Sequence, residues 1–285
     1  DMMIEDVHFS RELSSLEDVG WKALAVNISD IAAMGGLPRY ATVSLGLTAT
    51  DEAAGVYRGL AACARAFDVE IVGGDLVRSP RALVIDVAIL GECTAAAPVT
   101  RAGAKPGNVV VVTGALGAAA AGLAAWRHKP TATADPAIAE LILAQRRPQP
   151  RLEAGRRLAE LGATAMLDVS DGLAGDAGHI ANQSGLAIVL EANRIPVHPG
   201  AAAWATAQGS SALDLALYGG EDYELIACLP ADRYEEAAAA LAALGTPLSH
   251  IGRCEPGEGV WLEQGNSRVA LKARSWDHFR PPAST

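Results

Sequence analysis

The sequence predicts an α/β (α+β) protein of two domains, and three observations support this. The chain has 285 residues, of which 50% are hydrophobic, so it can bury one large core or two modest ones. Short Val/Ile/Leu segments alternate with Ala-rich amphipathic segments, as strands and helices do. Segment 100–108 contains Gly103, Pro106 and Gly107 and is the best candidate for a boundary. We therefore predict domains over residues 1–100 and 101–285.

The N-terminal domain is expected to mix strands and helices. A loop should follow the first residues, and Ser14 to Glu17 fits the capping box of a helix of about 20 residues that runs to Met34 and stops at Gly35. Strands are predicted over 39–47, 70–72 and 83–90, and a helix over 53–67. We expect the second of these strands to end in Gly73-Gly74-Asp75.

The C-terminal domain is expected to begin with a strand over 109–112. The turn Gly114-Ala115-Leu116-Gly117 then opens an Ala-rich helix, and such a turn can bind a phosphate on free backbone N–H groups. It lacks the Lys of a P-loop and the third Gly of a dinucleotide site, so a plain connection is the favoured interpretation. Further strands are predicted at 166–168, 187–191, 225–229, 249–252 and 260–262, with helices from 173, over 201–207 and over 231–244.

The composition excludes several classes of protein. The net charge of −10 argues against a generic binder of nucleic-acid backbones, although an acidic protein can bind a nucleotide through metal ions. No uninterrupted apolar run approaches about 20 residues, so we expect no membrane span and no signal peptide. The four cysteines form no Cys-x-x-Cys pair, which favours reduced thiols and a cytoplasmic location.

The long first helix carries polar residues where a core helix normally carries hydrocarbon. Asn27 and Asp30 share one helical face with Ala23 and Met34. A buried carboxylate needs a compensating partner, which a metal ion, a base or a helix N-terminus could provide. A satisfied structural Asp is the alternative, and the two interpretations remain open at this point.

Two later segments place acids beside glycines. Asp168-Val169-Ser170-Asp171-Gly172 follows a predicted strand, where its oxygens could converge on a metal or polyphosphate, or simply cap the next helix. Gly219-Gly220-Glu221 precedes the strand at 225, and its glycines would allow a ligand to approach Glu221 closely. An ordinary acidic turn is the competing interpretation.

Aspartate is what recurs along the chain, at strand ends or in otherwise apolar helices, at Asp1, Asp30, Asp75, Asp168 and Asp171. No histidine pair has zinc-site spacing, and no serine stands in Gly-x-Ser-x-Gly. Hard oxygen ligands without His or Cys suit Mg²⁺, and Mg²⁺ without a protein nucleophile suits phosphoryl transfer.

Six stretches together resemble the thiamine-monophosphate kinase family, in the family's order and across nearly the whole chain. They are Asp1-x-x-x-Glu5-x-x-His8-Phe9, Lys22 to Gly35, Gly73-Gly74-Asp75, Arg101-x-Gly103-Ala104-Lys105-Pro106-Gly107, Asp168 to Leu173 and Gly219 to Leu225. The resemblance implies the fold of the aminoimidazole-ribonucleotide synthetase superfamily. In that fold an N-terminal mixed sheet with helices pairs into a homodimer, and the C-terminal domain is an α/β sandwich.

The resemblance also implies roles for single residues. Asp1, Asp30, Asp75, Asp168 and Asp171 match positions that hold several Mg²⁺ ions, and Asp30 and Asp171 are the expected catalytic residues. Gly74, Arg101 and Ser170 match positions that contact ATP. His8, Glu221 and Trp276 match positions that hold thiamine monophosphate, with the Trp276 indole stacking on a thiamine ring. The implied reaction is direct in-line phosphorylation of thiamine monophosphate to thiamine diphosphate in the cytoplasm.

The chain departs from the family pattern at two places. Family members carry a Gly-Asp-Asp segment and a strand before the position of Asp1, so we expect the N-terminal domain to lack its first strand. Leu76 stands where the family usually has Thr. Two alternatives follow: a sister ATP-dependent synthetase of the superfamily, or a nucleotide-binding homologue with impaired catalysis. The sister that makes selenophosphate is expected to have a reactive Cys near its N-terminus, and no Cys precedes Cys63.

Overall fold

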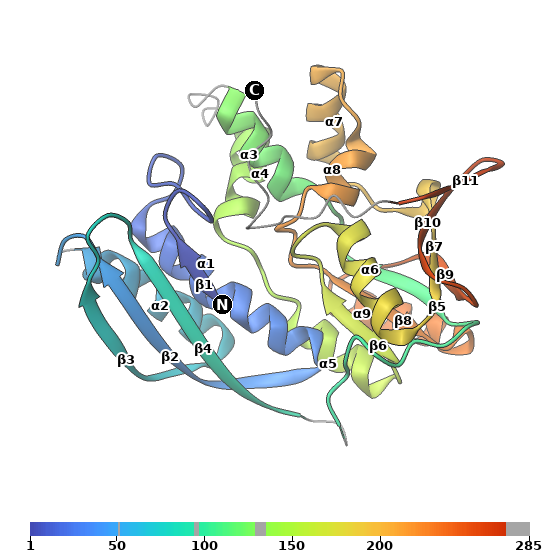
Figure 1. Ribbon diagram of the computed structural model, residues 1–285, viewed down its shortest axis with the longest axis horizontal. Helices are drawn as coiled ribbons and strands as arrows, with labels where there is room; N and C mark the ends of the chain where they lie inside the picture. Colours follow the sequence, from blue (N-terminus) through green and yellow to red (C-terminus); the bar gives the residue numbers. More distant parts are fainter. Residues whose placement is uncertain (51, 94–96, 129–134, 272–285) are drawn as a thin grey trace.

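The computed structural model describes residues 1–50, 52–93, 97–128 and 135–271. In these residues the chain forms two separate sheets, each packed against helices (Figure 1). This confirms the predicted α/β class. The predicted boundary near residue 100 falls in the connection between the last strand of the first sheet, which ends at Cys93, and the first strand of the second, which begins at Val109.

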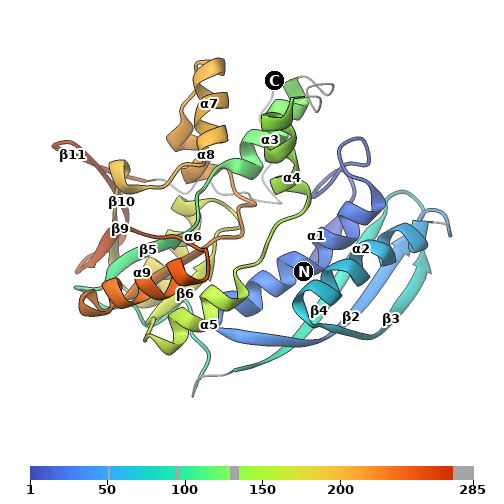
Figure 2. The same ribbon diagram turned by 180° about the vertical axis from the view of Figure 1, so that it is seen from behind.

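The first sheet has four strands in the order β1-β4-β2-β3, which are β1 Met2–Ile4, β4 Val84–Cys93, β2 Gly36–Leu47 and β3 Glu70–Arg78. β2 and β3 run parallel, and helix α2 (Glu52–Phe67) connects them; the other pairs are antiparallel. Helices α1 (Leu16–Ala33) and α2 cover one face (Figure 2). Burial alternates along most of β2, so the other face is left open to solvent.

Several boundaries in this domain differ from the prediction, two of them because of specific contacts. Ser15, not Ser14, is the N-cap of α1, and Asp18 rather than Glu17 closes the capping box. Strand β3 does not end at Gly73 but continues through Asp75 in register with β2. A Cβ at Gly74 would lie 1.8 Å from the Val43 carbonyl oxygen, so this glycine permits close approach between strands.

The second sheet has seven strands in the order β11-β10-β7-β9-β5-β8-β6. Val109 and Val111 of β5 face a core with helices α5 (Leu152–Glu160) and α9 (Tyr234–Ala243), while Val110 and Val112 face a core with α6 (Leu173–Ser184). Covered on both faces, this sheet forms the predicted sandwich. Its strands are β5 Val109–Thr113, β6 Ala165–Asp168, β7 Ala187–Glu191, β8 Leu225–Leu229, β9 Leu248–Glu255, β10 Gly259–Gln264 and β11 Ser267–Ala270.

Four more helices form a smaller cluster beside the N-terminal loop (Figure 1). They are α3 Ala118–His128, α4 Pro136–Arg146, α7 Pro199–Gln208 and α8 Ala212–Tyr218. Buried alanines and leucines let α3 and α4 pack closely, and a Cβ at Gly122 of α3 would lie 2.2 Å from the Leu141 carbonyl oxygen of α4. In the view of Figure 1 the four helices lie along the top of the molecule, on the same side as the N-terminal loop.

Helix α1 links the two halves of the molecule. Its Leu24 and Ile28 are fully buried in the first core, while Ala32 and Ala33 belong to the core built on α5 and the second sheet. Gly155 of α5 lies so close that a Cβ there would be 2.0 Å from the Ala32 carbonyl oxygen. The polar residues of α1 are thus held facing the turns that follow strands of the second sheet.

Candidate active site

A cavity of about 720 Å³ lies between the N-terminal segment, α1, α3 and the loop after α8. Five of the predicted site residues line it: Asp1, His8, Ser170, Asp171 and Glu221. These residues come from sequence positions up to 220 apart, and the docking of α1 on the second sheet brings them together. Their convergence makes this cavity the candidate active site.

The acidic end of the site is built around the end of β6. Asp168 is 4% exposed, and Ser29 Oγ of α1 donates a hydrogen bond of 2.6 Å to its Oδ2. Burial and the neighbouring Asp30 carboxylate raise the pKa of Asp168 to about 7. The pKa of Asp30 is also raised because protein displaces solvent around its carboxylate, although part of the residue stays exposed. The N-terminal ammonium and Arg101 act in the opposite direction. The structure therefore brings Asp30, Arg101 and Asp168 together.

A further acid, Asp176 of α6, was not predicted from the sequence. It is 2% exposed, its Oδ2 accepts a hydrogen bond from the Asp171 N–H at 3.2 Å, and burial followed by Asp168 and Asp171 raises its pKa well above its ordinary value. Asp171, Asp176 and His179 also offer ligand atoms within 4.8 Å of one another. The spacing of Asp176 and His179, one turn apart, is the sequence signal that could have revealed them.

The turn after β6 is not an ordinary helix cap. The N-cap residue of α6 is Gly172, with φ of 104° and no side-chain hydrogen bond, so neither Ser170 nor Asp171 acts as the cap. The alternative interpretation of this motif is therefore wrong. Burial raises the pKa values of Asp168 and Asp176, and repulsion between neighbouring carboxylates adds to that effect. Such a set of hard oxygen donors fits a divalent cation such as Mg²⁺.

Three predicted residues lie apart from the cavity or outside the described chain. Gly74 and Asp75 are exposed on β3, at the far edge of the first sheet, and do not line the cavity. In the sheet, Asp75 of β3 pairs with Ser44 of β2, Ser44 pairs with a residue of β4, and that residue pairs with Met2 of β1. Asp75 is therefore three strand spacings, about 14 Å, from β1 of the same chain. Trp276 lies outside the described residues.

The loop that follows α8 carries three acids with three different partners. Glu221 has φ of 59°, an uncommon value for a residue with a side chain. Its carboxylate forms an ion pair with the ammonium of Lys22, and Gln145 Nε2 of α4 donates to its Oε2 at 3.1 Å. Glu221 is therefore tied to both α1 and α4. The competing interpretation of this loop as an ordinary acidic turn does not account for these contacts.

The next acid, Asp222, decides the role of the Gly-rich turn at 114–117. The Gly117 N–H donates to Asp222 Oδ1 at 2.9 Å, and the N–H groups of Ala118 and Ala119 also act on this carboxylate. Its removal from solvent raises the pKa of Asp222 to about 8. An internal carboxylate thus fills the N-terminus of α3, which supports the favoured interpretation of a plain connection over a phosphate site.

The third acid, Glu224, locks the loop onto the second sheet. Arg151 binds its carboxylate with two hydrogen bonds, of 2.8 and 2.6 Å, and Thr113 Oγ1 donates a third of 2.6 Å. Between these acids, Tyr223 is buried in the core of the first domain. The three residues that follow Glu221 therefore fasten the loop to both domains.

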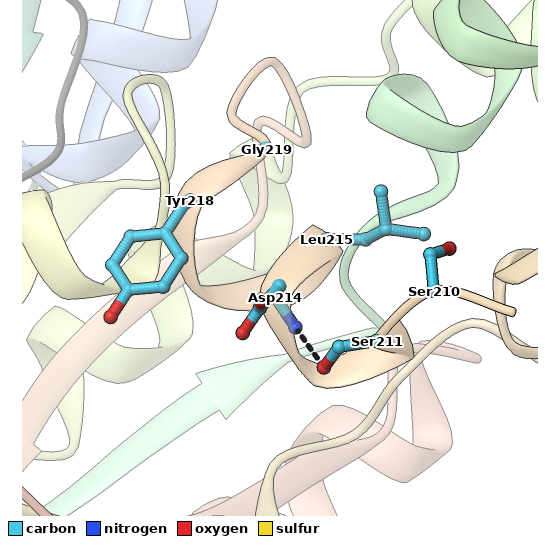
Figure 3. A pocket seen from close by; sticks show the side chains of 6 residues that line it. All are labelled: Ser210, Ser211, Asp214, Leu215, Tyr218 and Gly219. Atoms are coloured by element: carbon cyan, nitrogen blue, oxygen red, sulfur yellow. Dashed lines mark hydrogen bonds between the residues drawn. The ribbon is translucent and has the colours of Figure 1, made fainter.

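Aromatic side chains make up much of the remaining cavity wall. Phe9 and Trp126 line it, together with Tyr218 and Tyr223, and His8 holds its position by accepting a hydrogen bond from the Ile4 N–H at 3.0 Å. Trp126 lies in the Ala-rich helix α3, where nothing in the local sequence distinguishes it from a core residue. A smaller pocket of about 350 Å³, drawn in Figure 3, shares Tyr218 and Gly219 with the main cavity.

Comparison with known proteins places the chain in a family. Residues 1–93 match the model of the AIR synthase related protein N-terminal domain, and residues 105–263 match that of the C-terminal domain. The thiamine-monophosphate kinase of Bacillus subtilis is 34% identical across 98% of this chain and 87% of its own. That of Mycobacterium tuberculosis is 41% identical across 80% of this chain and 68% of its own. The chain belongs to the thiamine-monophosphate kinase family.

Solved structures of the thiamine-monophosphate kinase family show the same fold. The enzyme from Stenotrophomonas maltophilia superposes with a TM-score of 0.85 at 36% identity, covering 92% of this chain and 83% of its own. A structure described as AaThiL complexed with AMPPCP and TMP gives 0.88 at 32%, covering 98% and 85%. In the part of the chain that the structure describes, no helix has the length and apolar character needed to cross a bilayer.

Proposed function

We propose that this protein transfers the γ-phosphoryl group of ATP to thiamine monophosphate, producing thiamine diphosphate and ADP. The observation that carries the proposal is the convergence of His8, Ser170, Asp171 and Glu221 on one cavity. A family member that is 32% identical over nearly the whole chain has been solved with AMPPCP, an ATP analogue, and TMP. The protein would thus be a phosphotransferase of thiamine biosynthesis, and we place it in the cytoplasm.

The reaction is a direct in-line transfer. A terminal phosphate oxygen of thiamine monophosphate forms a bond to the γ-phosphorus of ATP while the bond to the bridging oxygen breaks, and ADP leaves with that oxygen. Because the acceptor phosphate is already anionic at neutral pH, correct positioning and neutralisation of charge can carry the rate without a strong base. Arg101 and Ser170 would contact ATP, and His8, Glu221 and Trp276 would hold the acceptor. Gly74, at the far edge of the first sheet, could reach the nucleotide only from a second copy of the chain.

The acidic end of the site would hold Mg²⁺ ions through Asp1, Asp30, Asp168 and Asp171, whereas Asp75, about 14 Å from β1 within one chain, could join them only from a second copy of the chain. When bound, these ions would neutralise the negative oxygens of the two phosphate groups. Burial raises the pKa values of Asp168 and Asp30, and repulsion from Asp30 adds to the effect on Asp168. A bound cation would stabilise the charged form of both carboxylates, which supports this assignment. Asp30 and Asp171 are the two acids that we assign as catalytic.

The first sheet would pair with that of a second copy to form a homodimer. Its edge strand β3 spans nine residues, and Val72, Leu76 and Val77 on it are each more than half exposed, as is Leu90 on β4. Exposed apolar strands at a sheet edge are typical of interfaces between chains. Light scattering should report a dimer, and Leu90→Asp should shift it toward monomer; a monomeric wild-type protein would contradict the pairing.

The deciding experiment incubates the protein with thiamine monophosphate and Mg-ATP and measures thiamine diphosphate by chromatography. We expect product from the wild-type protein and a loss of at least about 100-fold in Asp30→Asn, which keeps the shape of the side chain but not its charge. Absence of thiamine diphosphate from the wild-type reaction would refute the proposed function.

A further inference from the structure

A second feature of the cavity lies about two helical turns along α1 from Asp30. Lys22 of α1, Gln145 of α4 and Glu221 of the loop after α8 meet at the wall of the cavity. Lys22 is 3% exposed and Gln145 is 4% exposed. Lys22 forms an ion pair with Glu221 Oε1, and Gln145 Nε2 donates to Glu221 Oε2. Three separate elements thus bring a cation, an amide and a carboxylate together.

This cluster keeps hydrogen-bonding capacity that the protein does not use. In the described part of the chain, Gln145 Oε1 has no hydrogen-bond partner, and the Lys22 ammonium has none beyond its ion pair with Glu221. Both atoms are shielded from solvent, so bulk water does not replace the missing partners. Unsatisfied buried polar groups are rare in native proteins because they destabilise the fold, and at a cavity wall they indicate a ligand.

The charges of the cluster indicate what kind of ligand group it would bind. The positive charge of Lys22 is balanced by Glu221, so an incoming phosphate would meet a carboxylate beside the ammonium. A neutral group fits better if it offers a hydrogen-bond donor to Gln145 Oε1 and an acceptor to Lys22 Nζ. An aminopyrimidine edge has both, since its exocyclic amine donates and the adjacent ring nitrogen accepts.

The geometry of α1 separates this cluster from the acidic end. Lys22 and Asp30 are eight residues apart on one helix, which corresponds to about 12 Å along its axis. Val26, one turn after Lys22, lines the cavity between them. The helix thus spaces Lys22 from Asp30, as an extended acceptor with a ring at one end and a phosphate at the other requires. The Glu221 N–H donates to the Ser170 carbonyl oxygen at 2.8 Å, so Glu221 lies where the two ends of the site meet.

We propose that Gln145 and Lys22, together with Glu221, recognise the aminopyrimidine edge of the acceptor and so determine its specificity. Gln145 Oε1 accepts from the exocyclic amine, and Lys22 donates to the neighbouring ring nitrogen. Glu221, held at its positive φ, orients both side chains. This inference rests on the proposed function, because it takes thiamine monophosphate as the acceptor.

The test compares two acceptors: thiamine monophosphate and its analogue in which hydrogen replaces the exocyclic amine. We expect the wild-type protein to favour the amine by about 10- to 100-fold in kcat/KM. Gln145→Met should lower kcat/KM for thiamine monophosphate by a similar factor, and that for the analogue less than about 3-fold, with KM for ATP unchanged. Gln149→Met is the matched control, since Gln149 is exposed and only donates to the Arg147 carbonyl oxygen.

The outcomes separate this inference from the proposed function. No thiamine diphosphate from the wild-type protein would overturn both. An active wild-type protein that uses the two acceptors equally well would overturn the aminopyrimidine site alone, and this comparison does not depend on any variant folding. An equal loss on both acceptors in Gln145→Met would also overturn it, since that result would show a structural role for Gln145.

Discussion

Replacing Gly155 by Ala tests whether the contact between α5 and α1 sets the geometry of the active site. A methyl group at residue 155 would lie 2.0 Å from the Ala32 carbonyl oxygen, so the two helices must move apart by about 1 Å or more. Forcing extra volume into packed structure typically costs about 1–3 kcal/mol. The higher helix propensity of Ala offsets up to about 1 kcal/mol of this. We therefore expect the free energy of unfolding to fall by about 1–2 kcal/mol.

The assay combines urea unfolding with kinetics, and Gly178→Ala provides the control. Gly178 also lies inside a helix, but the nearest atom to its added Cβ would be Val260 Cγ2, at 3.9 Å. Gly178→Ala should thus be as stable as wild type or more stable, with unchanged kcat/KM. Because α1 carries Lys22 and Asp30, Gly155→Ala should also lower kcat/KM. If Gly155→Ala had the same stability and the same kcat/KM as Gly178→Ala, the contact between α5 and α1 would not set the geometry of the active site.

Two acids, Glu52 and Asp222, should affect stability in opposite directions with pH. Burial opposes ionisation of Glu52, but hydrogen bonds from Thr48 and Arg11 outweigh it and lower its pKa to about 2. The ionised Glu52 carboxylate therefore contributes fully to the free energy of unfolding above pH 4.5, and this contribution is lost as the pH falls toward 2. In urea unfolding at pH 7, Glu52→Gln should lower the free energy of unfolding by about 1–2 kcal/mol, a value reduced to allow for the solvent around Arg11. Near pH 2 it should have no effect. Burial raises the pKa of Asp222 to about 8, so its ionisation reduces stability as the pH rises from about 4 to 8. Over that range the free energy of unfolding should fall less in Asp222→Asn than in the wild-type protein, and an equal fall would contradict the assignment for Asp222. The assignment for Glu52 would be contradicted if Glu52→Gln remained less stable than wild type at pH 2.

Local patterns in the sequence predicted the elements well where neighbouring residues decide the structure. Strands 187–191 and 225–229 occur as predicted because short apolar runs bounded by polar residues leave few alternatives. Strand β3 was predicted too short, because two consecutive glycines normally indicate a turn. The requirement for glycine at Gly74 comes from the carbonyl of Val43 on another strand, which no local pattern reveals.

The same distinction explains which site residues could be predicted. Asp168 and Asp171 stand in a motif whose residues act together, so the sequence shows them. Lys22 lies in an apolar run and Gln145 near a helix end, and either could have been an ordinary surface residue. Only Glu221, more than 70 positions from Gln145 and almost 200 from Lys22, gives them a common role. The common role of Lys22 and Gln145 arises only when α1 packs against the second domain, so the local sequence does not reveal it.

The filled N-terminus of α3 bears on how this site can bind phosphates. In many nucleotide-binding folds the free N–H groups of a Gly-rich turn receive a phosphate directly. Here the N–H of Gly117 already binds Asp222, and the main cavity is lined by more acidic than basic side chains. Phosphate groups placed beside Asp171 would therefore be repelled unless cations intervene. Affinity for the nucleotide should accordingly come from divalent ions held by the acids around Asp168, and the fold supplies the positions of those acids instead of a phosphate-binding turn.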